Sequence, residues 1–173
     1  TLNHWFQTYS SLGAGAYLLW SNQRNRLREK LGLLLDCDGD DIGLGTSTSS
    51  LISNISLMID WKQSDRIMLF NGDFPSVITP IKSTASIFDL EIVMNDLSDF
   101  YEEPAMGLDK IEKELKKGLR LIAVSSPQFQ TGLLMPIKDI SLLCKKYGAE
   151  LMVDAAQSAL SLIHISEPTR HVD

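Results

Sequence analysis

Residues 151–157 read Leu-Met-Val-Asp-Ala-Ala-Gln. Their apolar start follows the turn residues Tyr147-Gly148, and a short apolar run after a turn is typical of a buried strand. Asp154 then lies at the carboxyl end of that strand, where open α/β sheets bind their ligands. The small residues Ala155 and Ala156 leave room for a flat ring. A carboxylate in such a place suits the protonated nitrogen of a pyridine ring.

The segments before this stretch alternate between strand and helix patterns. We expect helices over 14–35, 51–61, 108–117 and 136–147. We expect strands over 66–70, 90–94, 119–124 and 150–154, and a short strand over 42–44. Pro75 and Pro80 frame a short helix or loop. Strands that alternate with helices form βαβ units and a mainly parallel sheet. The predicted fold class is therefore α/β, arranged as three α/β/α layers.

Composition and charge narrow the class of protein. The chain has 173 residues, is 44% hydrophobic and carries a net charge of −6, which argues against nucleic acid or an anionic membrane as its main partner. No apolar run reaches the roughly 20 residues that span a bilayer. The two cysteines, Cys37 and Cys144, form no metal-binding pattern and no disulfide framework, which favours a reducing, cytoplasmic location.

A longer segment carries a family resemblance. Residues 124–159, VSSPQFQTGLLMPIKDISLLCKKYGAELMVDAAQSA, resemble the class V aminotransferases, which use pyridoxal 5'-phosphate. That family includes isopenicillin-N-epimerase-like, kynureninase-like and cysteine-desulfurase-like enzymes. The resemblance implies that residues 1–159 form part of the large domain of a fold-type-I enzyme. It also implies an amino acid as substrate and a homodimer when full length.

The resemblance gives Asp154 and Gln157 roles at the cofactor ring. Asp154 matches the aspartate that faces the ring nitrogen, and a carboxylate there favours the charged pyridinium, which is the better electron sink. Gln157 matches the residue that hydrogen-bonds the ring hydroxyl. The alternative for Asp154 is a cap on the following turn.

Ser47, Thr48 and Ser49 match the family's turn for the cofactor phosphate. The hydroxyl-rich residues 45–53 lead into an apolar helix, and a helix N-terminus offers backbone N–H groups and a favourable dipole to an anion. Ser50 departs from the pattern, because relatives often carry an acid there. A plain helix cap is the competing interpretation.

Phe74, in Asn71-Gly72-Asp73-Phe74-Pro75-Ser76, matches the aromatic residue that stacks on the cofactor ring. Many relatives have histidine there, so Phe74 favours the epimerase-like or kynureninase-like branch over the cysteine desulfurases. In the segment 128–132, Gln130 is a candidate to face substrate, as is Ser126 before it. The alternative is a plain turn in which Gly132 supplies a positive φ.

The lysine that holds the cofactor in this family is missing. It would follow Asp154 by about two dozen residues, whereas Lys145 and Lys146 precede it on a charged helix face. Residues 160–173 resemble a translated sequencing adapter, and we expect them not to belong to the natural protein. The chain as given should therefore not turn over substrate.

Two other interpretations of the function of this chain remain open. The run Leu33-Leu34-Leu35-Asp36-Cys37-Asp38-Gly39 resembles the opening motif of haloacid-dehalogenase-like phosphatases, with Asp36 as nucleophile and Asp38 as general acid. Against this, the residues before Asp36 follow helical spacing. The second alternative is a cofactor-binding remnant without catalytic activity.

Overall fold

The computed structural model describes residues 2–101 and 103–159, which fall into two compact units, residues 2–44 and 45–159. The expected non-native tail, residues 160–173, lies outside the described residues. None of the helices in the described ranges is long and apolar enough to cross a membrane.

The first unit is helical. It contains α1 (Leu2–Leu12), η1 (Gly13–Gly15), α2 (Ala16–Leu35) and η2 (Gly39–Asp41). Helix α2 confirms the helix predicted over 14–35, whereas α1 was not predicted. The strand expected over 42–44 is wrong, because these residues have irregular backbone and pair with no strand of the described chain.

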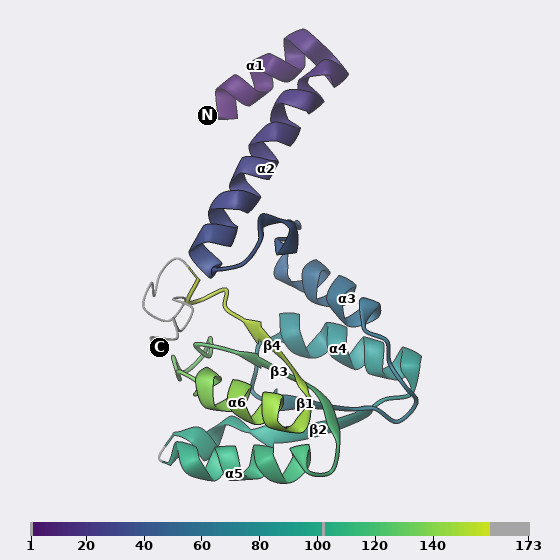
Figure 1. Cartoon of the computed structure of the whole chain (residues 1–173), viewed down its shortest axis with the longest axis vertical. Coiled ribbons are helices and arrows are strands. Elements are labelled where there is room, and N and C mark those ends of the chain that lie inside the picture. The colour runs from purple at the N-terminus through teal and green to yellow at the C-terminus, as the bar shows by residue number, and fades with distance from the viewer. Residues whose placement is uncertain (1, 102, 160–173) are drawn as a thin grey trace. The chain divides into compact units, whose positions relative to one another are not determined.

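The second unit alternates helices and strands as predicted. Its elements are α3 (Thr48–Met58), β1 (Arg66–Asn71), α4 (Pro75–Phe88), β2 (Glu91–Asp96), η3 (Leu97–Phe100), α5 (Pro104–Leu115), β3 (Leu119–Ser125), α6 (Ile137–Tyr147) and β4 (Glu150–Asp154) (Figure 1). The four strands form one parallel sheet in the order β2-β1-β3-β4. The parallel sheet confirms the predicted fold class.

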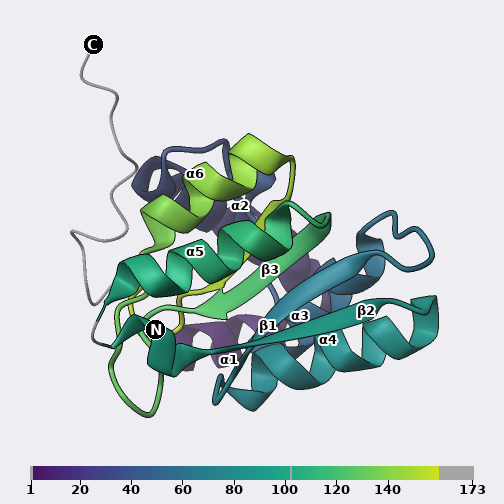
Figure 2. The same cartoon turned by 90° about the horizontal axis from the view of Figure 1, so that it is seen from below.

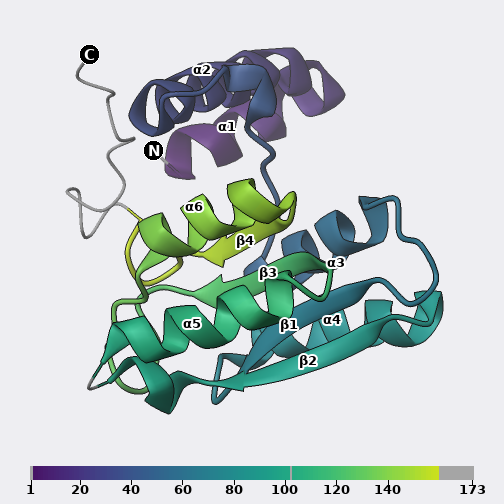
Figure 3. The same ribbon diagram turned by 60° about the horizontal axis from the view of Figure 1, so that its bottom comes forward.

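Helices cover both faces of this sheet, as Figures 2 and 3 show. Helices α5 and α6 pack on the face that buries Met68, Phe70, Ile122 and Val124. Helices α3 and α4 pack on the opposite face, which buries Ile67, Leu69, Leu121 and Ala123. Successive strand residues therefore point to opposite layers, and every second residue of a strand shares one layer.

Helix α4 is longer than predicted. The sequence suggested a short helix or loop framed by Pro75 and Pro80, but the helix continues through Pro80 to Phe88. A proline inside a helix removes one hydrogen bond and costs about 3 kcal/mol. Burial of Val77 and Ile81, both at most 1% exposed, offsets that cost, because each contributes about 1.5–3 kcal/mol.

Candidate functional site

A cavity of about 290 Å³ lies at the carboxyl ends of β3 and β4, beside the first turns of α3 and α4. Its lining combines hydroxyl, carboxylate and aromatic side chains: Ser47, Thr48, Ser49, Phe74, Ser76, Ser125, Pro127, Phe129, Asp154, Ala156 and Gln157. All six residues that the sequence predicted to bind a cofactor are among them. They come from segments more than 100 residues apart, so the fold alone brings them together.

Asp154 is the last residue of β4, and the sheet register explains its direction. Met152, two residues earlier, packs in the α3/α4 layer, so the Asp154 side chain points to the same layer. Its Oδ1 accepts a hydrogen bond from the Ala156 N–H (3.0 Å), and its Oδ2 accepts one from the Ser76 hydroxyl (3.4 Å). Asp154 thus caps the following turn, as the alternative interpretation proposed, while its half-buried carboxylate also lines the cavity.

Ser125 lies next to Asp154 in the register of β3 and β4. It is 5% exposed, and its hydroxyl has no hydrogen-bond partner among the described residues. Polar side chains buried in this way usually have a partner, so the Ser125 hydroxyl is a candidate donor to a molecule bound in the cavity that Ser125 lines. Sequence reasoning missed Ser125; counting alternate residues from Leu121 and Ala123 would have placed it on this layer.

Asp73 binds the backbone of two residues that line the cavity, Ser125 and Phe74, and sequence reasoning missed it as well. This buried carboxylate accepts one hydrogen bond from the Ser125 N–H through Oδ2 (3.0 Å) and one from the Phe74 N–H through Oδ1 (2.7 Å). Asp73 therefore ties the end of β1 to the end of β3 and fixes the residue that begins α4.

The three hydroxyl residues begin α3. Ser47 is the N-cap, with extended backbone, and its Oγ accepts a hydrogen bond from the Ser50 N–H (3.2 Å). Thr48 and Ser49 are the first two residues of the helix, and such residues have no backbone acceptor for their N–H groups within the helix. Ser47 therefore serves as the cap, while the next two residues present their N–H groups at the cavity wall.

Two aromatic rings lie at the cavity rim. Phe74 is 41% exposed, and its ring centroid lies 5.0 Å from that of Phe129 at an interplanar angle of 58°. With this much exposure the Phe74 ring does not fill the core, and it is accessible from the cavity that it lines. Phe129 was not among the predicted residues.

The loop after β3 matches the predicted turn. Gly132 has φ +69°, and its N–H donates to the Gln128 carbonyl (2.9 Å). Ser126 is buried and its carbonyl accepts from the Ser158 hydroxyl (2.8 Å), so Ser126 supports the loop from within. Gln130 does not line this cavity; it lines a second one beside it.

The remaining candidates lie elsewhere. Lys145 and Lys146 are exposed on α6, in the layer opposite the cavity, and Lys146 Nζ donates to Glu112 Oε1 (2.7 Å). The interpretation of residues 33–39 as a phosphatase motif is wrong, because residues 33–35 end α2 instead of forming a strand. Asp36 caps that helix with φ +53°, and Asp38 accepts a hydrogen bond from the Asp40 N–H (2.9 Å).

Comparison with known proteins places the chain in a family. The sequence profile of class-V aminotransferases matches residues 26–166. A probable cysteine desulfurase from Methanothermobacter thermautotrophicus is 25% identical over 91% of this chain and 39% of its own length. The mitosomal cysteine desulfurase of Encephalitozoon cuniculi is 25% identical over 76% of this chain and 31% of its own length.

A solved structure supports the fold. A cystine C–S lyase in complex with its reaction product, cysteine persulfide, aligns with a TM-score of 0.80 at 20% identity, over 92% of this chain and 44% of that chain. The chain thus spans 31–44% of the length of these three proteins. The profile match extends over most of the chain, and the chain belongs to the class-V aminotransferase family.

Proposed function

We propose that the cavity at the ends of β3 and β4 is the pyridoxal-phosphate site of an enzyme that acts on an amino acid. One observation carries the proposal: all six residues predicted from the sequence, on three separate segments, line one cavity of about 290 Å³. That volume suits a small cofactor. The lining groups fit as well, because the start of α3 suits an anion and the Asp154 carboxylate suits a cation.

The phosphate would bind at the start of α3. The N–H groups and hydroxyls of Thr48 and Ser49 would donate to it, aided by the helix dipole, while Ser47 keeps the helix end in place. The ring would lie between Phe74 and the small residue Ala156, with the Asp154 carboxylate facing its nitrogen. Gln157 would bond the ring hydroxyl, and Ser125 is a further donor in the wall.

The bound cofactor would supply an electron sink for bond cleavage next to the substrate nitrogen. Asp154 keeps the ring nitrogen protonated, because a nearby carboxylate favours the charged form. The Ala156 N–H and the Ser76 hydroxyl hold the carboxylate in its orientation. Phe74 and Phe129 cover the rim and limit the access of water. No lysine lines this cavity among the described residues, so none is given the covalent role.

The second, more specific part of the proposal is the reaction that the full-length enzyme catalyses. The relatives reported above are cysteine desulfurases and a cystine C–S lyase, which favours cleavage of a carbon–sulfur bond in a sulfur-containing amino acid. Transamination, epimerisation and the epimerase-like or kynureninase-like branch suggested by Phe74 stay predictions. The homodimer, the cytoplasmic location and the domain limit at residue 159 also stay predictions; one relative is described as mitosomal.

A binding experiment tests the site. Pyridoxamine phosphate is the preferred probe, because it lacks the aldehyde that reacts with surface lysines. Equilibrium dialysis of the full chain should show tighter binding of pyridoxamine phosphate than of pyridoxamine. The double variant Thr48→Val/Ser49→Ala removes the hydroxyl donors but keeps the backbone N–H groups, so it should reduce that difference, whereas Ser53→Ala, one turn further along α3, should preserve it. Equal binding of both probes by the unaltered chain would reject the phosphate site.

Asp154→Ala tests the ring contact separately. It should weaken binding of both probes by about tenfold, the value of one charge-assisted hydrogen bond of about 1.4 kcal/mol or more. In a full-length version, the same change should abolish turnover, measured as sulfide and alanine released from cysteine. Intact cofactor binding without sulfur release by the unaltered full-length enzyme would reject the sulfur chemistry and leave the cofactor site standing.

A further inference from the structure

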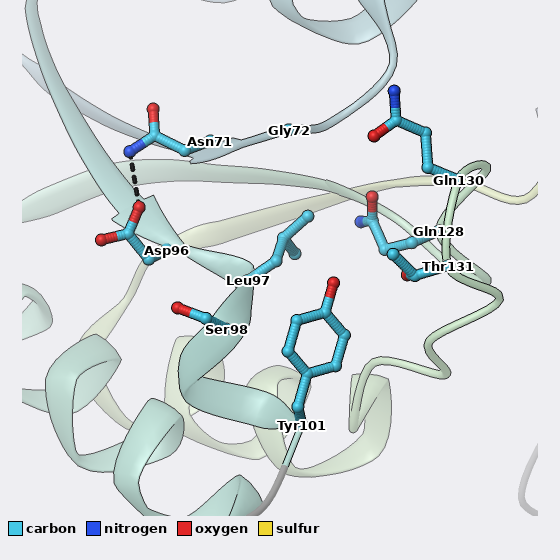
Figure 4. A pocket seen from close by; sticks show the side chains of 9 residues that line it. All are labelled: Asn71, Gly72, Asp96, Leu97, Ser98, Tyr101, Gln128, Gln130 and Thr131. Atoms are coloured by element: carbon cyan, nitrogen blue, oxygen red, sulfur yellow. Dashed lines mark hydrogen bonds between the residues drawn. The ribbon is translucent and has the colours of Figure 1, made fainter.

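Two buried polar side chains border the proposed cofactor cavity without lining it. Asp73 is 8% exposed and Gln128 is 3% exposed. Gln128 lines a neighbouring cavity instead, together with the other residues that Figure 4 shows. Neither side chain takes part in the proposed cofactor chemistry. Burying a polar group is costly unless it makes hydrogen bonds, so the bonds of these two residues indicate what they do.

Both side chains hold the backbone of Ser125. Asp73 Oδ2 accepts a hydrogen bond from the Ser125 N–H (3.0 Å), and Gln128 Nε2 donates one to the Ser125 carbonyl (2.8 Å). Strand β1 pairs with β3 as far as Met68 and Ile122, so beyond that point the Asp73 carboxylate supplies an acceptor that a neighbouring strand supplies elsewhere in the sheet. The backbone of Ser125 is therefore fixed from two sides.

This arrangement leaves the hydroxyl as the free polar group of Ser125. The hydroxyl is buried, has no hydrogen-bond partner among the described residues, and belongs to a residue that lines the cavity. A buried hydroxyl without a partner lowers the stability of the fold. Two buried side chains nevertheless hold its backbone in place, which is the arrangement expected of a group that is positioned for a ligand.

Asp73 also holds the residue that carries the aromatic ring of the cavity. Its Oδ1 accepts a hydrogen bond from the Phe74 N–H (2.7 Å), which fixes the N-cap of α4. Ser76, in the first turn of α4, donates to Asp154 Oδ2 (3.4 Å). One buried carboxylate is therefore bonded to two residues of the cavity and fixes the start of the helix that supports a third.

We propose that Asp73 and Gln128 are positioning residues of the cofactor site. They act through Ser125, whose hydroxyl they hold at the cavity wall, and Asp73 acts also through the ring of Phe74. The proposal rests on the proposed function, because a bound cofactor is the partner that the Ser125 hydroxyl lacks. The alternative is that both side chains only stabilise the fold.

Binding affinity separates positioning from stability. Equilibrium dialysis of the full chain with pyridoxamine phosphate is carried out below the unfolding transition of each variant, with folding checked by circular dichroism. Asp73→Asn and Gln128→Leu should each weaken binding by about two- to tenfold, the value of one hydrogen bond or one ring contact. Gly107→Ala also destabilises the chain, from α5 in the layer opposite the cavity, and should leave the affinity unchanged.

Double-mutant cycles identify the residues through which the effect passes. In a chain that already carries Ser125→Ala, Gln128→Leu should change the affinity by less than about twofold, because the hydroxyl that it positions is gone. Asp73→Asn should have equally little effect in a chain that carries both Ser125→Ala and Phe74→Ala. Ser125→Ala alone should weaken binding several-fold without lowering Tm, because its hydroxyl has no hydrogen-bond partner among the described residues.

The outcomes distinguish this inference from the proposed function. No binding of pyridoxamine phosphate by the unaltered chain would reject both. Binding by the unaltered chain, with the same affinity in a folded Asp73→Asn or Gln128→Leu variant, would overturn this inference alone. Losses that stay the same in the chains that carry Ser125→Ala would also overturn it. If one of the two variants does not fold, the other decides.

Discussion

Replacing Asp73 by alanine should destabilise the protein far more than an ordinary surface change. Its carboxylate accepts two backbone hydrogen bonds, from Ser125 and Phe74, at 3.0 and 2.7 Å. A hydrogen bond to a charged group contributes about 1.5–3 kcal/mol, and the unpaired N–H left behind is itself costly when buried. The Ser125 bond is buried, whereas the Phe74 N–H is only partly buried and water can replace its acceptor. We therefore expect a loss of about 3–5 kcal/mol.

Urea unfolding, followed by circular dichroism, measures this loss as the change in the free energy of unfolding. For a chain of this size a loss of 3–5 kcal/mol corresponds to a fall in Tm of roughly 6–20 °C. Asp73→Asn keeps one carbonyl oxygen and should lose about half as much. Asp109→Ala, exposed on α5, is the matched control and should stay within about 0.5 kcal/mol. An Asp73→Ala variant within 1 kcal/mol of that control would refute the reasoning.

Three further changes probe the ring contact, the surface charges and the packing of the second unit. Phe74→Ala should weaken pyridoxamine phosphate binding by up to about tenfold in equilibrium dialysis, because ring stacking contributes about 0.5–1.5 kcal/mol beyond burial; unchanged affinity would reject stacking. Hydrogen bonds from Lys146 and then Tyr147 lower the pKa of the Glu112 carboxyl from 4.5 to about 2. The ionised Glu112 therefore stabilises the folded state fully above pH 4.5, and this stabilisation is lost as the pH falls toward 2. Thermal unfolding of Glu112→Gln should depend less on pH in that window, and an identical pH profile would contradict this. Gly107→Ala should lower the free energy of unfolding, measured in urea, by about 1–3 kcal/mol, because a Cβ at this position would collide with the Phe100 ring. This cost outweighs the gain of about 1 kcal/mol in helix propensity. An equally stable variant would show that the ring can move aside.

The strands were predictable to within one or two residues, and the pattern is clearest in β1 and β3, which are buried on both faces. Buried parallel strands carry continuous apolar runs, such as 67–70 and 121–124, and these runs are visible without any alignment. The run at 42–44 looked similar but is too short, and it has no neighbouring strand among the described residues to pair with. Local pattern alone could not distinguish the two cases.

Helix boundaries were harder where tertiary contacts override local preference. Pro80 predicts an interruption, yet α4 continues because its apolar face is buried against the sheet. Helix α1, in contrast, buries none of its residues, and no acidic residue marks its first turn. A helix without these signals leaves little for sequence reasoning to detect.

The residues at the candidate site also differ in how far they could be predicted from local sequence. Asp154, Gln157 and Phe74, which line the cavity, were predicted from family motifs, which are local in the sequence. Asp73 and Ser125 were missed because their importance comes from a contact across 52 positions, between the end of β1 and the end of β3. Such a contact depends on strand order and register, which the sequence does not state directly.

The placement of these groups suggests why a cofactor would bind in one orientation. The first turn of α3 presents N–H groups and hydroxyls, and β4 presents the Asp154 carboxylate, both to the same cavity. A molecule with a phosphate at one end and a protonated ring nitrogen at the other satisfies both groups in one direction only. In the reverse direction the phosphate would face Asp154, and like charges in a partly buried cavity repel. The orientation would therefore follow from the opposite charge preferences of the α3 start and Asp154, before any covalent bond to the protein is made.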